Sequence, residues 1–315
     1  MSEVVVEAEV QSGHTPVSNR PEDTDFAIDE LVTEAPSPGE GAEAASLPDD
    51  VIEAVEGAER PEIDLSAVFT VPDSDPHDIG EASFGPPPGL AEIVHGPDDR
   101  VRIHNTGESP WRMSASLLIT ARDNSTWIGT AWFIGPHTLM TAGHCVYIKD
   151  SGVPGRDGWV KKINVMPGRN GTNLPYGSVT SISFRTVTGW ANAGDADYDY
   201  GAIILPNDLG KKTGWFGFGV YSDADLTNTT GNLTGYPSDK PAGQQWYDWQ
   251  KVASVSNRKV YYDIDTVGGQ SGSAVYRLKE GGRYAFAIHA YGHATVNSGT
   301  RISSPVFNNM VNWKK

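Results

Sequence analysis

The hydrophobic pattern of the chain from residue 93 onward consists of short apolar runs rather than long helical stretches. These runs are rich in β-branched and aromatic residues and are separated by Gly, Asn, Asp and Pro, as is typical of strands joined by tight turns. An all-β fold, either a sandwich or one or two barrels, accommodates such a pattern. Near the carboxyl end Val306, Phe307, Met310 and Val311 predict one short helix. We expect strands at 114–121, 131–134, 162–166, 201–205, 250–255, 259–263, 273–278 and 284–291.

Residues 1–92 have a different pattern, rich in Glu, Asp, Pro, Ala and Ser and poor in apolar side chains. A segment of this composition buries too little apolar surface to offset the entropy of ordering, so we expect it to be largely disordered. One amphipathic helix over 47–59 is the exception that the pattern allows. The Pro-rich run 85–89 reads as a linker. The chain therefore divides into an acidic segment, 1–92, and a globular domain, 93–315.

The net charge of −16 is distributed unevenly between these two parts. Residues 1–92 contain 23 acidic and two basic side chains, a net charge of −21, whereas 93–315 have a net charge of +5. Neither part carries the clustered Lys and Arg that nucleic acid or an anionic membrane requires, so we expect neither as a partner. We see no secretion signal in the first residues and no run of apolar residues long enough to span a membrane. The single cysteine, Cys145, excludes an internal disulfide and any multi-cysteine metal site.

Three motifs could carry chemistry, and they supply a histidine, an aspartate and a serine in that order. His144 follows an apolar run, Asp199 precedes one, and Ser271 lies in a Gly-rich stretch, 268–274. A serine nucleophile needs a base within hydrogen-bond reach and a carboxylate that orients this base. It also needs backbone N–H donors for the developing oxyanion, which glycines beside the serine can present. The combination predicts acyl transfer.

Each motif also has a simpler interpretation. His144 alone could be an ordinary core residue, and Ser271 alone part of a turn. Asp195, Asp197 and Asp199 alternate as in a calcium loop, although the Gly and Glu of an EF-hand are missing. The Gly-rich stretch lacks the Lys of a phosphate-binding loop. No motif implies a metal or an organic cofactor.

The motifs together resemble those of chymotrypsin-like serine proteases, and more closely the bacterial glutamyl endopeptidases. The resemblance rests on Thr-Ala-Gly-His-Cys-Val-Tyr, Tyr-Asp-Tyr-Gly-Ala-Ile, Gly-Gly-Gln-Ser-Gly-Ser and Ala-Ile-His, and it covers 93–315. It implies two six-stranded antiparallel β-barrels of the trypsin type with a short C-terminal helix. It also implies that His144 is the general base, Asp199 its orienting carboxylate and Ser271 the nucleophile. The backbone N–H groups of Gly269 and Ser271 would form the oxyanion hole.

The same resemblance extends to specificity. A pocket for a substrate carboxylate needs hydrogen-bond donors or positive charge. The family places a histidine on the penultimate strand and a hydroxyl residue five positions before the nucleophile, which are His289 and Thr266 here. The following residues, Ala290, Tyr291 and Gly292, would pair with the backbone of an extended polypeptide substrate. His289 and His293 are four apart, but Gly292 and the β pattern disfavour a helical zinc site.

The mature chain of the family begins near Ile93 of this sequence, directly after Glu92. A glutamate-specific enzyme could cut its own Glu92–Ile93 bond, which would make 1–92 a propeptide and place a new amino group near the pocket. Two positions depart from the family pattern. The cysteine beside the catalytic histidine is often disulfide-bonded in the family, but the partner position is Gly129 here, so we expect Cys145 to be a free thiol. Gln270 stands where chymotrypsin has an aspartate. The resemblance implies a secreted protein, and we expect a monomer.

These observations leave three functional hypotheses. The first is a serine endopeptidase that prefers Glu, or Asp, before the scissile bond. The second is a trypsin-like serine protease of different specificity. The third is a catalytically silent binding module of the protease fold.

Overall fold

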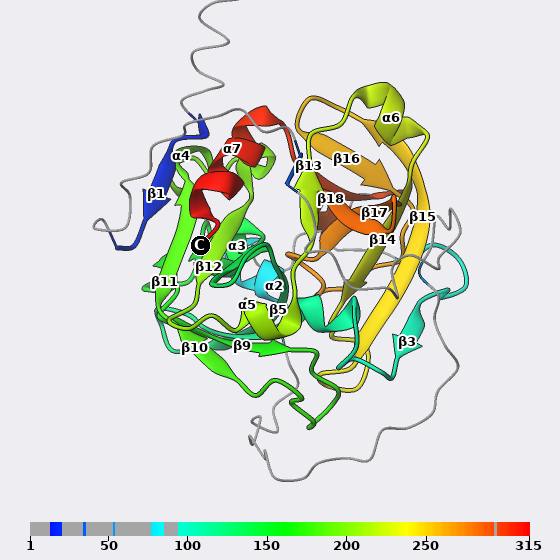
Figure 1. Ribbon diagram of the computed structural model, residues 1–315. Helices are drawn as coiled ribbons and strands as arrows, with labels where there is room; N and C mark the ends of the chain where they lie inside the picture. The colour runs from blue at the N-terminus through cyan, green and yellow to red at the C-terminus, as the bar shows by residue number, and fades with distance from the viewer. Residues whose placement is uncertain (1–12, 21–33, 36–52, 54–76, 85–93, 293–294) are drawn as a thin grey trace, which may run out of the picture.

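The structure is a computed structural model that describes residues 13–20, 34, 35, 53, 77–84, 94–292 and 295–315. The strands form two large β-sheets that lie side by side, coloured largely green and largely yellow to orange in Figure 1. The predicted helix over 47–59 falls outside the described residues except for Glu53, and so do the linker 85–89 and the Glu92–Ile93 bond.

The first sheet has eight strands, and its pairings among the described residues run as an open path. Its central strands combine apolar and β-branched residues that alternate between two faces, as β4 with Leu117 and Ile119 illustrates. These side chains pack with Phe133, Ile163 and Ile203 in one buried cluster. The strand order is β1 (Pro16–Ser18), β11 (Ser183–Val187), β12 (Gly201–Ile204), β6 (Thr138–Thr141), β5 (Thr126–Phe133), β4 (Ser114–Thr120), β9 (Lys162–Pro167) and β10 (Val179–Ser181).

The second sheet closes into a ring, because β18 pairs with β19 on one side and with β17, the first strand of the order, on the other. The ring contains six strands in the order β17 (Ala274–Lys279), β14 (Thr230–Gly235), β15 (Gln245–Val255), β16 (Lys259–Tyr262), β19 (Asn297–Arg301) and β18 (Gly282–Gly292), which returns to β17. Leu233, Val260, Val275 and Phe286 fill part of its core. β3 (Val101–Ile103) pairs with β15, and β13 (Gly217–Gly219) pairs with β18.

Short helices and a small hairpin connect these strands. The C-terminal helix α7 (Ser304–Trp313) buries Val306, Phe307, Met310 and Trp313 on one face, so its apolar residues recur at helical spacing as predicted. The remaining elements are η3 (Trp111–Met113), α3 (Gly143–Val146), β7 (Tyr147–Ile148), β8 (Gly158–Trp159), α4 (Thr188–Ala191), η4 (Ala196–Tyr198), α5 (Gly210–Thr213) and α6 (Asp223–Thr227).

The described parts of the acidic segment are attached to both sheets. β1 pairs with β11 and forms the edge of the first sheet, and nearby His14 Nδ1 lies 3.0 Å from the Tyr200 hydroxyl. β2 (Glu34–Ala35) pairs with β13. The buried carboxylate of Glu53 accepts two hydrogen bonds from Arg283, at 2.6 and 2.9 Å. α2 (Ile79–Phe84) packs against β5 of the first sheet and against α3.

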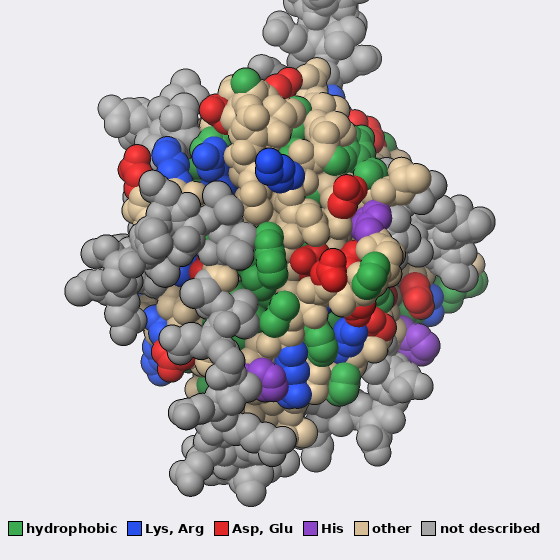
Figure 2. Space-filling view, turned by 90° about the vertical axis from the view of Figure 1, so that its right-hand side faces the viewer, with side chains coloured by type: hydrophobic (Ala, Val, Ile, Leu, Met, Phe, Trp, Pro, Cys, Tyr) green, Lys and Arg blue, Asp and Glu red, His purple; other side chains and the backbone are tan. Residues whose placement is uncertain are grey.

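The all-β class and the C-terminal helix are confirmed. The two-barrel prediction is confirmed in part, since a six-stranded ring closes in the second sheet while the first remains an open path in its described pairings. Acidic and basic side chains are interspersed on the face of the molecule that Figure 2 shows. Among the described residues, no helix is long and apolar enough to cross a membrane.

Candidate active site

His144 and Asp199 are brought together by two neighbouring strands. His144 lies in α3, directly after β6, and Asp199 directly precedes β12, which pairs with β6 so that Gly201 lies opposite Thr141. His144 Nδ1 lies 2.6 Å from Asp199 Oδ2, and the His144 backbone N–H donates to Asp199 Oδ1 at 2.8 Å. Because a carboxylate only accepts, Nδ1 carries the proton, and Nε2 is left to act as a base.

The other two aspartates of the motif have local roles. The Asp195 side chain accepts the Asp197 backbone N–H at 3.0 Å and so caps η4. Asp199 is the one that is fully buried and contacts His144. Gly143 makes this approach possible, because a Cβ there would lie 2.8 Å from Asp199 Oδ1.

The Ser271 loop, residues 268–273, connects β16 to β17 and is held by hydrogen bonds to both sheets. The Thr130 hydroxyl donates to the Gly269 carbonyl at 2.8 Å, and the Thr130 N–H donates to the Ser271 carbonyl at 2.9 Å. Gly269 and Gly272 have φ of 98° and 92°, in the region that favours glycine. A Cβ at Gly272 would lie 2.2 Å from the Thr130 carbonyl oxygen. The sequence motif is therefore a fixed turn, and Thr130 is a positioning residue that the motif did not reveal.

This loop reaches the histidine as well. Cys145, the neighbour of His144, has its thiol sulfur 3.7 Å from the Ser271 carbonyl oxygen. Ser271 and His144 are each only 1% exposed. Within the described part of the chain, His144 Nε2 has no hydrogen-bond partner. The arrangement provides a buried base whose tautomer is set and a serine on a rigid loop beside it.

His289 and Thr266 both lie close to the Ser271 loop in the fold. The Gly272 N–H donates to the His289 carbonyl at 2.8 Å, and the His289 N–H donates to the Ser273 carbonyl at 2.9 Å. His289 Nδ1 lies 2.7 Å from the Tyr262 hydroxyl, which orients the ring. Thr266 is fully buried, and its hydroxyl has no hydrogen-bond partner among the described residues. His293, the second member of the zinc alternative, lies outside the described residues.

The three residues that follow His289 complete strand β18. Ala290 and Tyr291 are each 4% exposed, and a register irregularity separates His289 from Tyr291 in the pairing with β19. Tyr291 and Gly292 lie opposite Ser298 and Asn297 of β19.

The comparisons with known proteins identify the family. No family model matches the chain. The chain is 41% identical over 235 residues to the glutamyl endopeptidase of Bacillus licheniformis, and the alignment covers 72% of this chain and 71% of the relative. The chain belongs to the glutamyl endopeptidase family of serine proteases. A solved structure of a Glu endopeptidase in complex with MPD is 28% identical, with a TM-score of 0.61, and covers 70% of this chain and 98% of that one.

A second relative carries a different name. An extracellular metalloprotease of Bacillus subtilis is 39% identical over 222 residues, covering 70% of this chain and 69% of the relative. The described residues of this glutamyl endopeptidase family member contain no group of three or more His, Cys, Asp or Glu side chains that could hold a metal ion.

Electrostatics couple His144 and Asp199 strongly. Burial works to lower the pKa of His144, but the Asp199 charge and hydrogen bond outweigh it, so this pKa lies well above the usual value. Burial also works to raise the pKa of Asp199, but the His144 charge and the hydrogen bonds from His144 and Tyr291 lower it. The aspartate is therefore ionised, and it favours the protonated form of the histidine.

Two buried residues of this glutamyl endopeptidase family member support Asp199 through contacts that the motifs did not predict. The Tyr291 hydroxyl donates to Asp199 Oδ2, although we expected Tyr291 only as a backbone contact. Lys259, 5% exposed, donates to the Ala196 carbonyl at 2.5 Å and lies 4.8 Å from the centre of the Tyr291 ring. Burial lowers the pKa of Lys259 to about 8. The only sequence signal for Lys259 was a lysine at the start of a strand whose other residues are apolar or aromatic.

The two departures from the family pattern have clear structural counterparts. Cys145 is a free, buried thiol, and a Cβ built at Gly129 would lie 3.2 Å from its sulfur. The Gln270 amide oxygen accepts the Val267 N–H at 3.0 Å and lies 3.4 Å from the Arg100 guanidinium. Gln270 therefore ties the loop before Ser271 to the strand region near residue 100.

Proposed function

We propose that residues 93–315 form a serine endopeptidase domain that cleaves polypeptides after glutamate, with His144, Asp199 and Ser271 as its catalytic triad. The observation that carries this proposal is the hydrogen-bonded pair of His144 and Asp199 beside the rigid Ser271 loop. The name of the B. licheniformis relative supports the preference for Glu. We propose that the domain acts as a monomer.

We propose the following course for the reaction. His144 Nε2 takes the Ser271 hydroxyl proton as the oxygen attacks the scissile carbonyl, and the Gly269 and Ser271 N–H groups stabilise the oxyanion. Collapse of the tetrahedral intermediate breaks the C–N bond, and His144 gives its proton to the leaving amine. Water then attacks the acyl-enzyme with His144 again as base, which releases the acid and restores Ser271. Asp199 keeps its charge and stabilises the imidazolium in both halves.

We place the side-chain carboxylate of the substrate against Thr266 and His289. Both are buried next to the Ser271 loop, and the Thr266 hydroxyl still has a hydrogen bond to offer. The strand Ala290–Gly292 would hold the extended substrate backbone. The His95 N–H donates to Asp265, next to Thr266, at 2.6 Å, so His95 lies near this proposed pocket.

We further propose that residues 1–92 are a propeptide removed at Glu92–Ile93, leaving the amino group of Ile93 as an added positive charge near the pocket. The adjacent His95 contact supports this placement. The B. subtilis relative is named an extracellular protein, which supports secretion of this one.

Covalent labelling tests the catalytic assignment. A fluorophosphonate should modify one residue, Ser271, and Ser271→Ala should abolish the labelling. His144→Ala should lower the rate of cleavage by several orders of magnitude while the protein remains folded by circular dichroism. Labelling that survives in Ser271→Ala would contradict the assignment.

A peptide panel that varies the residue before the scissile bond tests specificity. Cleavage after Glu should exceed cleavage after Leu, Gln or Lys, with Asp second. His289→Leu should depress Glu cleavage by at least about tenfold, the value of one charge-assisted hydrogen bond, without reducing fluorophosphonate labelling. His137→Leu, at a histidine outside the site, is the matched control. Amino-terminal sequencing of active protein should read Ile93-Val94-His95.

A further inference from the structure

Residues 77–84, which precede the proposed cut, pack against the active site. α2 contacts both β5 and α3, the helix that carries His144. Ile79, Ala82 and Ser83 are fully buried. Ile79 belongs to the same apolar cluster as Cys145, so this short stretch is part of the core of the catalytic region.

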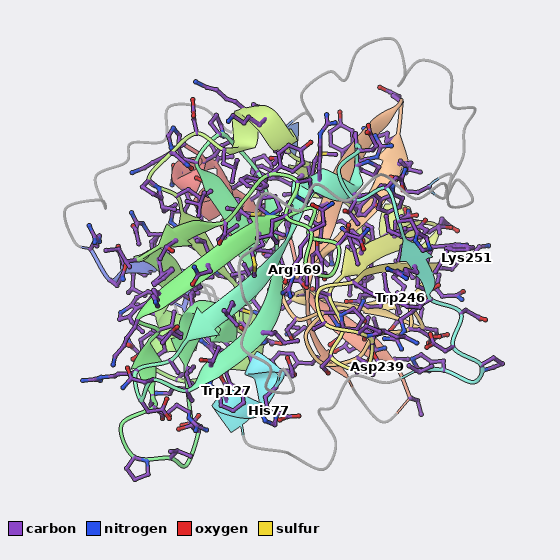
Figure 3. All side chains as sticks on the ribbon, turned by 90° about the horizontal axis from the view of Figure 1, so that it is seen from below. His77, Trp127, Arg169, Asp239, Trp246 and Lys251 are labelled. Atoms are coloured by element: carbon purple, nitrogen blue, oxygen red, sulfur yellow. The ribbon has the colours of Figure 1, made fainter. Side chains whose placement is uncertain are left out.

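Backbone pairing fixes the start of this stretch. The Ile128 N–H of β5 donates to the His77 carbonyl at 2.9 Å, and Asp78 forms a parallel bridge with Ile128. The His77 ring lies against the Trp127 ring, with 6.0 Å between their centres (Figure 3). Asp78 is thereby held at one position relative to the Ser271 loop.

The Asp78 carboxylate binds one of the two backbone N–H groups that we propose as oxyanion donors. The Gly269 N–H, the first proposed oxyanion donor, donates to Asp78 Oδ1 at 2.8 Å. A Cβ at Gly268 would lie 2.8 Å from the Asp78 Cβ, so glycine is needed there for the close approach. A charged acceptor forms a strong hydrogen bond with a backbone N–H, and an N–H that is engaged in this way is not available to a substrate carbonyl.

We infer that β5 and the Ser271 loop form a binding surface for residues 77–84, and that the Asp78 carboxylate blocks the oxyanion hole until this stretch leaves. The surface fits a peptide that presents an aspartate directly followed by an apolar residue, Ile79 here. The inference rests on the proposed catalytic role of Ser271, and it assigns a specific inhibitory contact to the acidic segment.

The first test measures labelling of Ser271 by a fluorophosphonate in the full chain. Glu92→Gln keeps the proposed cut closed. Adding Asp78→Ala in this background should raise the labelling rate by about tenfold to a hundredfold, the range expected for one hydrogen bond to a charged group. Glu81→Gln, which changes an exposed acid of α2 three residues after Asp78, is the matched control and should leave the rate unchanged. Equal labelling of all three proteins would overturn the inference while upholding Ser271 as nucleophile.

The second test does not depend on catalysis. In the full chain with Ser271→Ala, hydrogen exchange at the Gly269 amide should be at least about tenfold faster with Asp78→Ala than without it. Glu81→Gln should again have no effect. Unchanged exchange at Gly269 would overturn the inference whether or not the protein is an active protease. Faster exchange together with no labelling in any variant would uphold the contact and contradict the proposed function.

Discussion

Replacing Tyr291 by Phe would isolate the contribution of one hydroxyl to the His144–Asp199 pair. The Tyr291 hydroxyl donates to Asp199 Oδ2, the same oxygen that receives His144 Nδ1. A hydrogen bond to a charged group contributes about 1.5 to 3 kcal/mol. The Phe ring keeps the apolar contacts of this buried position, so the loss should be confined to the hydrogen bond.

The loss should depend on pH in a defined direction. Hydrogen bonds from His144 and Tyr291 lower the pKa of Asp199 in the folded state, after burial has acted to raise it. A carboxyl whose folded pKa is lowered adds stability above the unfolded pKa of about 3.9, and that stability is lost as the pH falls through the folded pKa. Tyr291→Phe should therefore reduce the free energy of unfolding by about 2 kcal/mol at pH 7 and by less at acid pH.

Activity gives a second readout of the same change. Without the tyrosine donor, Asp199 concentrates more negative charge on His144 and raises its pKa further, so the acid limb of kcat/KM should move to higher pH. The shift should not exceed about two pKa units, the equivalent of 3 kcal/mol. Urea unfolding of the Ser271→Ala protein measures the first effect, and the pH profile of the active protein measures the second.

The matched control is Tyr262→Phe, which removes a hydroxyl 2.7 Å from His289 Nδ1 instead. It should change the preference for Glu and leave the acid limb in place. The reasoning would be refuted if Tyr291→Phe left both the stability at pH 7 and the acid limb unchanged, or if Tyr262→Phe moved the acid limb equally.

Three further changes follow from individual contacts. Gly129→Cys should form a disulfide with Cys145, detected as loss of the free thiol, and stabilise the protein by about 3 kcal/mol in urea unfolding. Gly269→Ala should lower kcat by about 10²-fold or more with little change in KM, because φ is 98° there and a Cβ would lie 2.6 Å from the Tyr236 carbonyl. Between pH 8 and 10.5 the folded state binds fewer protons at Lys259 than the unfolded state does, so the free energy of unfolding should rise with pH. Urea unfolding of Lys259→Met at both pH values should show that this rise is lost.

The sequence predicted those strands whose apolar, β-branched composition suits a buried position in a sheet. Strands such as β4 and β12 are apolar and β-branched, and they lie in the centre of the first sheet. The His and Ser motifs were recognisable because their chemistry requires particular residues at adjacent positions. Gly269 and Gly272 are such required residues, because both adopt positive φ beside Ser271.

Two strands of the closed ring could not be predicted because their residues favour turns. β19 has the sequence Asn-Ser-Gly-Thr-Arg, yet it lies between β16 and β18 and is buried throughout. β14 contains two glycines and an asparagine and lies between β15 and β17. Small residues are needed here, since a Cβ at Gly299 would lie 2.7 Å from the Ile288 carbonyl oxygen. Tertiary packing overrides the intrinsic preference in both strands.

The contacts that support the site were hidden for a different reason. Tyr291, Lys259 and Thr130 each act on a residue that is distant in the chain, through one hydroxyl or ammonium group. Nothing in the local sequence around these residues specifies the partner. The pairing exists only once the sheets have formed, so spacing rules could not find it.

The acidic segment was recognisable from its composition, but its contact with the active site was not. Its composition distinguished it from the protease domain, but composition could not single out Asp78 among its many acids. The Asp78 carboxylate contacts the Gly269 N–H, whereas the proposed pocket for a substrate carboxylate is formed by Thr266 and His289. The segment therefore binds the proposed oxyanion donor through a side chain, whereas a substrate glutamate would occupy the proposed pocket. Changes at His289 should consequently alter which bonds are cleaved without releasing Asp78, and loss of the Asp78 charge should release the site without altering which bonds are cleaved.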